Sequence, residues 1–242
     1  MPSAHPGGRH TSVPGLRDRP LDLTSSGTGP GAVDLHDISG PTRALPVRDR
    51  RHTAGMVEPE VLRATPGDRA RAAADALGDD VLTDWCADLL AGRATWGDPE
   101  LPDIGWVGGQ VVSGWGSPDH LDDDTRYWTQ VWAARTLLYV WADGCASDVV
   151  AGLADPAWRV REMSAKVAAR WEVGSAADPC ADLVTTDEVP RVRAAAARVL
   201  GAVGEAEHAA ALHEAVDDQA ESVRVAAARA LGTLERRLDR TL

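Results

Sequence analysis

Acidic and basic residues recur at a fixed spacing in the second half of the sequence, and such pairs could act as general acids and bases. In each pair an Asp precedes an Arg by six positions. The pairs are Asp155 with Arg161, Asp187 with Arg193, and Asp218 with Arg224. An Asp near a helix N-terminus accepts backbone N–H bonds and can also bind a neighbouring Arg. Because successive repeats have the same structure, each repeat needs the same pair at the same position. We therefore interpret the pairs as structural and predict no catalytic residue among them.

Tryptophan is the second residue type that could build a site. The chain contains nine Trp and no Phe, and several of the Trp lie in or directly after a Gly-rich stretch at 92–124. The candidate binding residues are Trp96, Trp106, Trp115, Asp119, Trp128 and Trp132. They could form the core of an irregular insertion. Alternatively, they could form an aromatic surface with an acidic rim, which would favour a basic partner or a cationic ligand.

Metal, cofactor and nucleophile sites are not predicted. The three Cys are far apart and have no His at the spacing of a catalytic pair. His208 and His213 are five positions apart, so they share a helical face poorly. The acidic run at 119–124 lacks the spacing of a calcium loop and is interpreted as a cap for the helix that follows. We predict no metal site and no cofactor.

A basic stripe is the last candidate. Its members are separated by 31, 32 and 31 positions. They are Arg135, Lys166, Arg198 and Arg229. The stripe could bind an extended anion, but on an acidic protein it is expected to form local ion pairs on a solvated face.

Helical repeats must position these residues. Apolar residues at helical spacing predict an all-α fold, an α-solenoid of helical hairpins with an irregular Trp/Gly-rich insertion. Residues 1–55 are rich in Pro and Gly and are expected to be disordered, either as an extension upstream of Met56 or as a flexible tail. Residues 56–242 are expected to form the repeat domain. It would comprise a degenerate N-terminal hairpin at 56–91, the insertion at 92–124 and repeats at 125–242.

Thr65, Pro66 and Gly78 mark the first predicted helix as its N-cap, first turn and stop. The next predicted helix carries one apolar face. That face consists of Val81, Leu82, Trp85, Leu89 and Leu90. The shorter second helices of the repeats are expected at 147–154, 178–184 and 205–216.

The repeated pattern D-x-x-x-x-V-R-x-x-A-A-x-A-L-G resembles the short HEAT repeats that also occur in phycobilisome-type lyases. The resemblance covers residues 125–238, with a degenerate copy at 66–91. It implies that the Asp and Arg of each pair form a hydrogen-bond ladder between neighbouring repeats. The copy at 125–142 departs from the pattern, because Thr129 lies near the expected Arg and bulky Trp and Tyr replace Ala and Val.

Charge and hydropathy limit the function. The net charge of −12 argues against nucleic acid as a partner, and no stretch has the ~18 apolar residues of a membrane span. We expect a cytoplasmic protein, with an Arg-rich composition typical of a GC-rich bacterial genome. The favoured function is a non-catalytic scaffold that uses an acidic solenoid groove and the Trp-rich insertion to bind a protein partner or a cationic ligand. The alternative is an enzyme with a Trp/Asp pocket, of the HEAT-like DNA glycosylase or lyase type.

Overall fold

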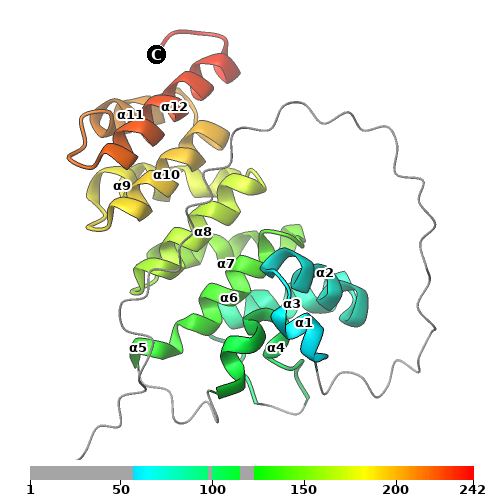
Figure 1. The fold of residues 1–242 in the computed structure, drawn as a ribbon. Helices are drawn as coiled ribbons and strands as arrows, with labels where there is room; N and C mark the ends of the chain where they lie inside the picture. Colours follow the sequence, from blue (N-terminus) through cyan, green and yellow to red (C-terminus); the bar gives the residue numbers. More distant parts are fainter. Residues whose placement is uncertain (1–56, 98–99, 115–122) are drawn as a thin grey trace, which may run out of the picture. The chain divides into compact units, whose positions relative to one another are not determined.

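The computed structural model describes residues 57–97, 100–114 and 123–242 (Figure 1). Within these ranges every regular element is a helix and no strand is present. The predicted all-α class is therefore confirmed. The prediction that residues 1–55 are disordered lies outside the described residues.

Capping residues set the boundaries of the first helices. These are α1 (Pro59–Arg63), α2 (Pro66–Leu77) and α3 (Asp79–Leu90). Thr65 is the N-cap of α2, as predicted, and its hydroxyl accepts a hydrogen bond from the backbone N–H of Asp68 at 3.2 Å. Gly78 ends α2 with a φ of 94°, a value that glycine adopts readily. The predicted apolar face of α3 is buried except for Val81, which is 53% exposed.

The described part of the insertion contains short helical segments that pack on the neighbouring helices. It contains α4 (Gly105–Gly108), η1 (Gly109–Gly114) and α5 (Asp123–Arg126). The buried guanidinium of Arg69 in α2 holds the insertion by donating to the backbone carbonyl of Val107 at 3.2 Å, and it also donates to that of Ala64, just before α2, at 2.9 Å. Gly109 has a φ of 66°, and a Cβ there would lie 2.6 Å from Arg69 Nη1. Only glycine therefore allows the chain to pass this close to the arginine.

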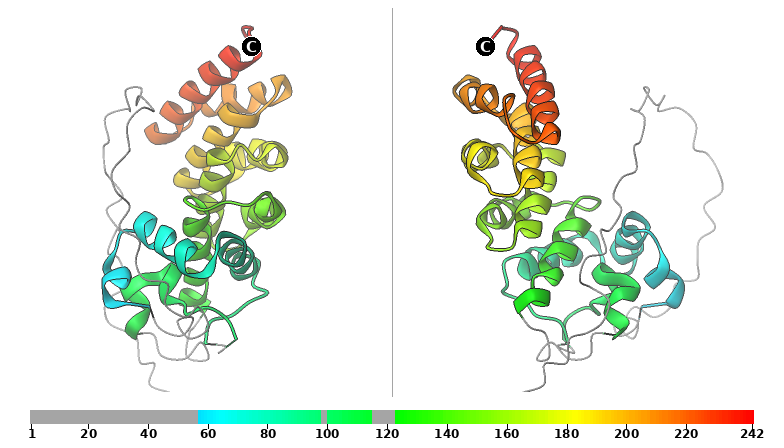
Figure 2. Two further views of the ribbon diagram at one scale, coloured as in Figure 1. Left: turned by 90° about the vertical axis from the view of Figure 1, so that its right-hand side faces the viewer. Right: turned by 60° about the vertical axis from the view of Figure 1, so that its left-hand side comes forward.

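Long and short helices alternate along the rest of the chain. The long helices are α6 (Trp128–Leu137), α8 (Trp158–Arg170), α10 (Pro190–Val203) and α12 (Glu221–Leu238). The short helices are α7 (Ala146–Ala151), α9 (Ala177–Thr186) and α11 (Ala209–Ala215). They are flanked by the 3-10 turns η3 (Asp143–Cys145), η4 (Gly152–Ala154), η5 (Gly174–Ala176) and η6 (Ala206–His208). The long helices stack in chain order and the short helices form a second layer beside them (Figure 2). This is the predicted α-solenoid, and the three predicted second helices are confirmed.

The insertion lies between the two members of a helical pair. Helix α3 packs against α6, and α7, α9 and α11 pack against α8, α10 and α12. Helix α3 contacts its sequence neighbour α2 less extensively than it contacts α6. In addition, the side chain of Gln130 in α6 donates to the backbone carbonyl of Leu90 at the end of α3, at 3.0 Å. The chain thus leaves the first pair after α3, forms the insertion and returns with α6 to complete the pair.

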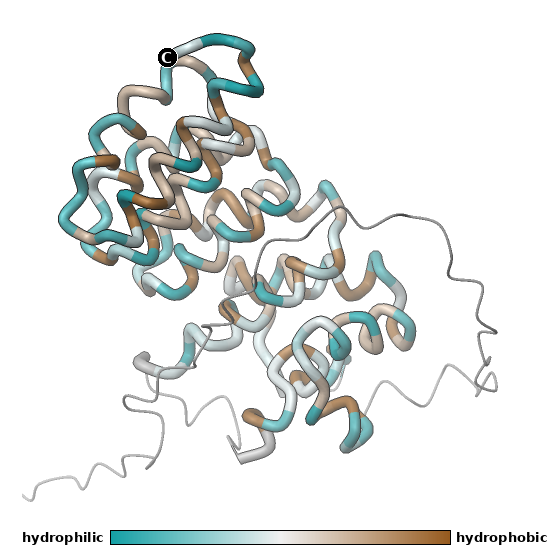
Figure 3. Tube along the Cα trace, turned by 45° about the horizontal axis from the view of Figure 1, so that its top comes forward, coloured by the Kyte–Doolittle hydropathy of each residue, from teal (hydrophilic) through white to brown (hydrophobic). Residues whose placement is uncertain are grey.

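Small residues build the core between the long helices. Polar and apolar residues alternate along these helices (Figure 3). The apolar residues of α10 between Val192 and Leu200 are buried, and so are Val223, Ala226, Ala227 and Ala230 of α12. A Cβ on Gly201 would lie 2.9 Å from the Cα of Ala230, so glycine is needed for α12 to approach α10 this closely.

An Asp–Arg ladder joins neighbouring repeats. Arg161 Nε donates to Asp187 Oδ2 at 2.7 Å. Arg193 repeats this contact one step later with two bonds to Asp218, at 2.7 and 2.8 Å. Each Asp also caps its own loop, since the Asp187 carboxylate accepts from the N–H of Val189 at 2.8 Å. The structural interpretation of the Asp–Arg pairs is confirmed.

The two ends of the ladder differ from its middle. At the start, Gln130 rather than Thr129 takes the place of the arginine, and its amide donates to Asp155 Oδ2 at 3.0 Å. Thr129 instead donates to the carbonyl of Arg126. At the far end, Arg224 keeps its bonds to the loop carbonyls, at 2.8 and 3.0 Å, but no carboxylate of the described residues pairs with it.

Candidate binding face

Three of the six Trp and Asp residues predicted to bind a partner are part of the core. The side chains of Trp96, Trp106 and Trp132 are 8%, 6% and 4% exposed and pack in the main apolar cluster. Trp115 and Asp119 lie outside the described residues. This burial agrees with the interpretation in which the insertion uses Trp to build its own core. Binding by these residues stays a prediction, and an exposed site must be sought elsewhere.

Trp128, the remaining predicted residue, is partly exposed and belongs to a cluster of aromatic rings and guanidinium groups. Its ring stacks on Tyr127, with 5.4 Å between centroids, and lies 5.2 Å from the guanidinium of Arg159. Arg159 also lies 4.4 Å from the ring of Trp158, which in turn lies 5.7 Å from the guanidinium of Arg191. The cluster thus links the first turns of α6, α8 and α10 through cation–π contacts.

Sequence reasoning missed Trp158, Arg159 and Arg191 as parts of one site. The signal was available in the repeat spacing, because Trp128, Arg159 and Arg191 are 31 and 32 positions apart. Equivalent positions of successive repeats lie on adjacent helices, so these side chains were bound to be neighbours.

The four members of the basic stripe have different environments. Arg135 is partly buried, and burial lowers the pKa of its guanidinium. Lys166 forms the expected local ion pair with Glu162, at 2.9 Å. Arg198 and Arg229 are exposed, and neither guanidinium has a hydrogen-bond or ion-pair partner within the described residues. The expectation of local ion pairs therefore holds for Lys166 alone.

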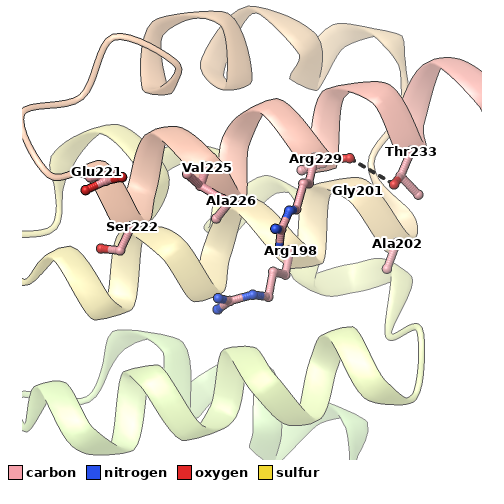
Figure 4. Close-up of a pocket in the computed structure, with 10 residues that line it drawn as sticks. Arg198, Gly201, Ala202, Glu221, Ser222, Val225, Ala226, Arg229 and Thr233 are labelled. Carbon is pink, nitrogen blue, oxygen red and sulfur yellow. Dashed lines mark hydrogen bonds between the residues drawn. The ribbon is translucent and has the colours of Figure 1, made fainter. Parts of the chain in front are cut away.

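Arg198 and Arg229 line an open groove between α10 and α12. Its volume is about 590 Å³. Figure 4 shows Arg198 reaching from α10 and Arg229 from α12, with Val225 beside them. Val225 is 42% exposed, and Gly201, Ala226 and Ala230 add further apolar surface. The groove therefore combines apolar surface with two cations.

The charge of this groove differs from that of the acidic solenoid groove expected from the sequence, which stays a prediction. Its charged lining residues are Arg198, Arg229 and Glu221, so it is basic, whereas an acidic solenoid groove was expected. The net charge of −12 does not determine the charge of one groove, since it averages over acids that lie elsewhere. Many of these acids are concentrated in residues 56–127 and in the loops that form the ladder.

Comparison with protein families identifies the repeats. The family model described as HEAT repeats matches residues 146–232. Residues 146–232 are HEAT repeats. The matched span contains the helices from α7 to most of α12, including both walls of the groove.

Other comparisons add little to the HEAT assignment. No curated protein matches the sequence at a significant level. Among solved structures, the chain is similar to human deoxyhypusine hydroxylase in complex with glycerol, with 20% identity over 74% of this chain and 72% of that chain. The TM-score of 0.43 is too low to support an argument about function.

Catalytic features are scarce around the HEAT repeats. Among the described residues, no three His, Cys, Asp or Glu side chains gather to hold a metal ion. Burial raises the pKa of all three Cys thiols, that of Cys180 to about 12, so they are poor nucleophiles. Buried His208 bonds to Asp178 at 3.0 Å and to the N–H of Glu205 at 2.8 Å, which is a capping role. No described helix has the length and hydropathy to cross a membrane.

Proposed function

We propose that the chain is a non-catalytic binding module whose HEAT repeats hold an acidic segment of a partner protein on the exposed side of α10 and α12. The observation that carries the proposal is the pair of guanidinium groups, Arg198 and Arg229, that share one groove without a counter-ion in the described residues. HEAT repeats expose long surfaces of this kind because each repeat contacts only its neighbours.

Charge selects the class of partner. A guanidinium binds a carboxylate through two parallel hydrogen bonds, and such charge-assisted bonds are about twice as strong as neutral ones. The apolar surface of Val225 and the neighbouring Ala residues suits the apolar side chains of a peptide. Nucleic acid fits less well, since it needs several phosphate contacts and would approach a protein with a net charge of −12.

An enzymatic role has little support from the groove itself. Glu221 is the only carboxylate that lines it, and neither His nor Cys is present among its lining residues. A general acid–base pair would need a second titratable group within hydrogen-bond reach. The groove therefore favours binding over catalysis.

Selection from a library of random dodecapeptides on the immobilised full-length chain tests the function. We expect the selected peptides to be rich in Asp and Glu, and the double variant Arg198→Glu/Arg229→Glu to lose them. The control is Arg236→Glu/Arg240→Glu, which changes the net charge equally at exposed positions outside the groove. Basic or neutral peptides, or acidic peptides that bind both double variants equally, would refute the proposal.

A further inference from the structure

One repeat of this protein already contains the anion that the groove lacks. In α8, Glu162 is only 7% exposed and its carboxylate lies 2.9 Å from Lys166 Nζ and 3.1 Å from Arg191 Nε. A single carboxylate thus neutralises two cations that come from adjacent long helices, α8 and α10. Glu162 precedes Lys166 by four positions, so the two side chains lie on the same face of α8.

The next two repeats keep the cation of Lys166, as Arg198 and Arg229, and replace the acid, while Ser222 stands where Arg191 does one repeat earlier. The residue four positions before Arg198 is Ala194, and the residue four positions before Arg229 is Val225. Both are the positional equivalents of Glu162, being 32 and 63 residues further along the chain. At the α10–α12 step the groove therefore presents two guanidinium groups and an apolar side chain, where the α8–α10 step has a built-in carboxylate.

Other charged groups do not fill this gap. Glu221, the acidic residue of the groove, is eight positions before Arg229 on α12, which places it about 12 Å away along the helix axis. The side chain of Thr233 donates to the backbone carbonyl of Arg229 and leaves the guanidinium free. Like charges on two neighbouring helices repel each other unless an anion lies between them.

We propose that the groove is a receptor for one carboxylate, in which a Glu or Asp side chain of the partner lies between Arg198 and Arg229 and neutralises two cations of adjacent long helices, as the single Glu162 carboxylate does for Lys166 and Arg191. This inference rests on the proposed function and specifies how the partner is recognised. Apolar residues beside the acidic one contact Val225 and Ala226, while the anchor carboxylate accepts hydrogen bonds from both arginines. The partner thus supplies the carboxylate that Glu162 supplies within the chain one repeat earlier.

The substitution Val225→Glu tests the inference directly. It places a carboxylate four positions before Arg229, with the spacing of Glu162 and Lys166, so the groove supplies its own anion and no longer needs one from a partner. The matched control is Val225→Gln, which has nearly the same size and no charge. The melting temperature should not fall in Val225→Glu, which separates loss of binding from loss of folding.

Fluorescent nonapeptide libraries with a fixed central residue serve as probes of the full-length chain. The central residue is Glu, Gln or phosphoserine, and the flanking positions are drawn from Ala, Leu and Ser. Fluorescence anisotropy should show binding of the Glu library at least about tenfold tighter than the Gln library, since one charge-assisted anchor is lost. Val225→Glu should weaken the Glu library about tenfold or more, and Val225→Gln much less.

The outcomes separate this inference from the proposed function. If Arg198→Glu/Arg229→Glu abolishes binding of acidic peptides while Val225→Glu and Val225→Gln bind equally well, the module binds acids but not through a single bridged carboxylate. Tightest binding of the phosphoserine library would overturn the choice of a carboxylate. If the arginine double variant binds like the unaltered chain, the proposed function fails as well.

Discussion

Removal of Arg193 should destabilise the repeats more than removal of Arg224, its equivalent one repeat later. Both arginines donate to carbonyls of their own loop, Arg193 to Asp187 O and Arg224 to Asp218 O, each at 2.8 Å. Arg193 alone adds two bonds to the Asp218 carboxylate, at 2.7 and 2.8 Å. The comparison of Arg193→Ala with Arg224→Ala therefore isolates the ion pair between repeats.

The magnitude follows from the burial of this pair. The Arg193 and Asp218 side chains are 13% and 11% exposed. An exposed pair contributes about 0–1 kcal/mol, whereas breaking a buried pair costs about 3–5 kcal/mol. We expect Arg193→Ala to lose about 2 kcal/mol more than Arg224→Ala, an intermediate value. For a domain of this size the difference corresponds to about 4–8 °C in melting temperature.

The pH dependence of this difference provides a second readout. The hydrogen bonds from Arg193 lower the pKa of the Asp218 carboxyl below its ordinary value. In the unfolded chain the pKa of this carboxyl is about 4, and in the folded chain it is lower. The stability that results is present when the pH is above the unfolded-state pKa, and it is lost as the pH falls through the folded-state pKa. The gap between the unaltered chain and Arg193→Ala should thus be constant above about pH 5 and shrink in more acidic solution.

Urea unfolding followed by circular dichroism measures both effects. Equal midpoints for Arg193→Ala and Arg224→Ala at pH 7 would refute the assignment of the ladder as the bond between repeats. A gap that stays constant down to pH 2 would show that the lost stability comes from packing of the arginine stem rather than from Asp218.

Three further predictions concern packing. Gly201→Ala should lower the unfolding free energy by about 1–3 kcal/mol, because a Cβ would lie 2.9 Å from the Cα of Ala230. Gly232→Ala, one repeat later, should raise the unfolding free energy by about 0.5–1 kcal/mol, since only the end of a flexible side chain lies within 4 Å, and urea midpoints check both variants. A thiol-reactive dye should label none of the three Cys in the native protein and all three after unfolding. All three are buried, and burial raises the pKa of Cys180 to about 12. Labelling of the folded chain would contradict this prediction. Trp106→Ala should cost about 3–5 kcal/mol, and a variant with an unchanged melting temperature would show that this indole is not core.

The repeats could be predicted because their determinants are local and recur. Two spacings, of the basic stripe and of the Asp–Arg pairs, repeat together every 31 to 32 residues. Each repeat contacts only its neighbours, so short-range periodicity carries most of the information about the fold. The capping of α2 by Thr65 and Gly78 was predictable for the same reason.

The pairing of α3 with α6 could not be predicted, since these contacts are not local. Adjacency in sequence favoured a hairpin of α2 and α3, whereas α3 forms its main contacts with α6, on the other side of the insertion. The ladder position in α6 was missed because an arginine was expected. The amide of Gln130 also donates hydrogen bonds, and it bonds to Leu90 O and to the Asp155 carboxylate at once.

The charge of the groove between α10 and α12 does not follow from the net charge of the chain, because ion pairing depends on one neighbouring residue. The four basic residues of the stripe look alike in sequence, but only Lys166 has an acid four positions before it. The net charge of the chain does not reveal which of the basic residues has an acid at that position. The residue type at that position of each repeat is enough to separate Lys166 from Arg198 and Arg229 by sequence alone.

Stability and binding are assigned to different arginines in this solenoid, and this separation makes the proposals testable. Arg193 forms three short hydrogen bonds, so its removal should lower the free energy of unfolding. Arg198, five positions later, has no hydrogen-bond or ion-pair partner in the part of the chain that the structure describes, so its removal should leave the unfolding free energy within about 0.5 kcal/mol. A loss of peptide binding in Arg198→Ala at an unchanged melting temperature would therefore report on the groove alone. If Arg198→Ala instead destabilised the chain as much as Arg193→Ala, Arg198 would belong to the framework, and the groove would lack the free cation on which its proposed function depends.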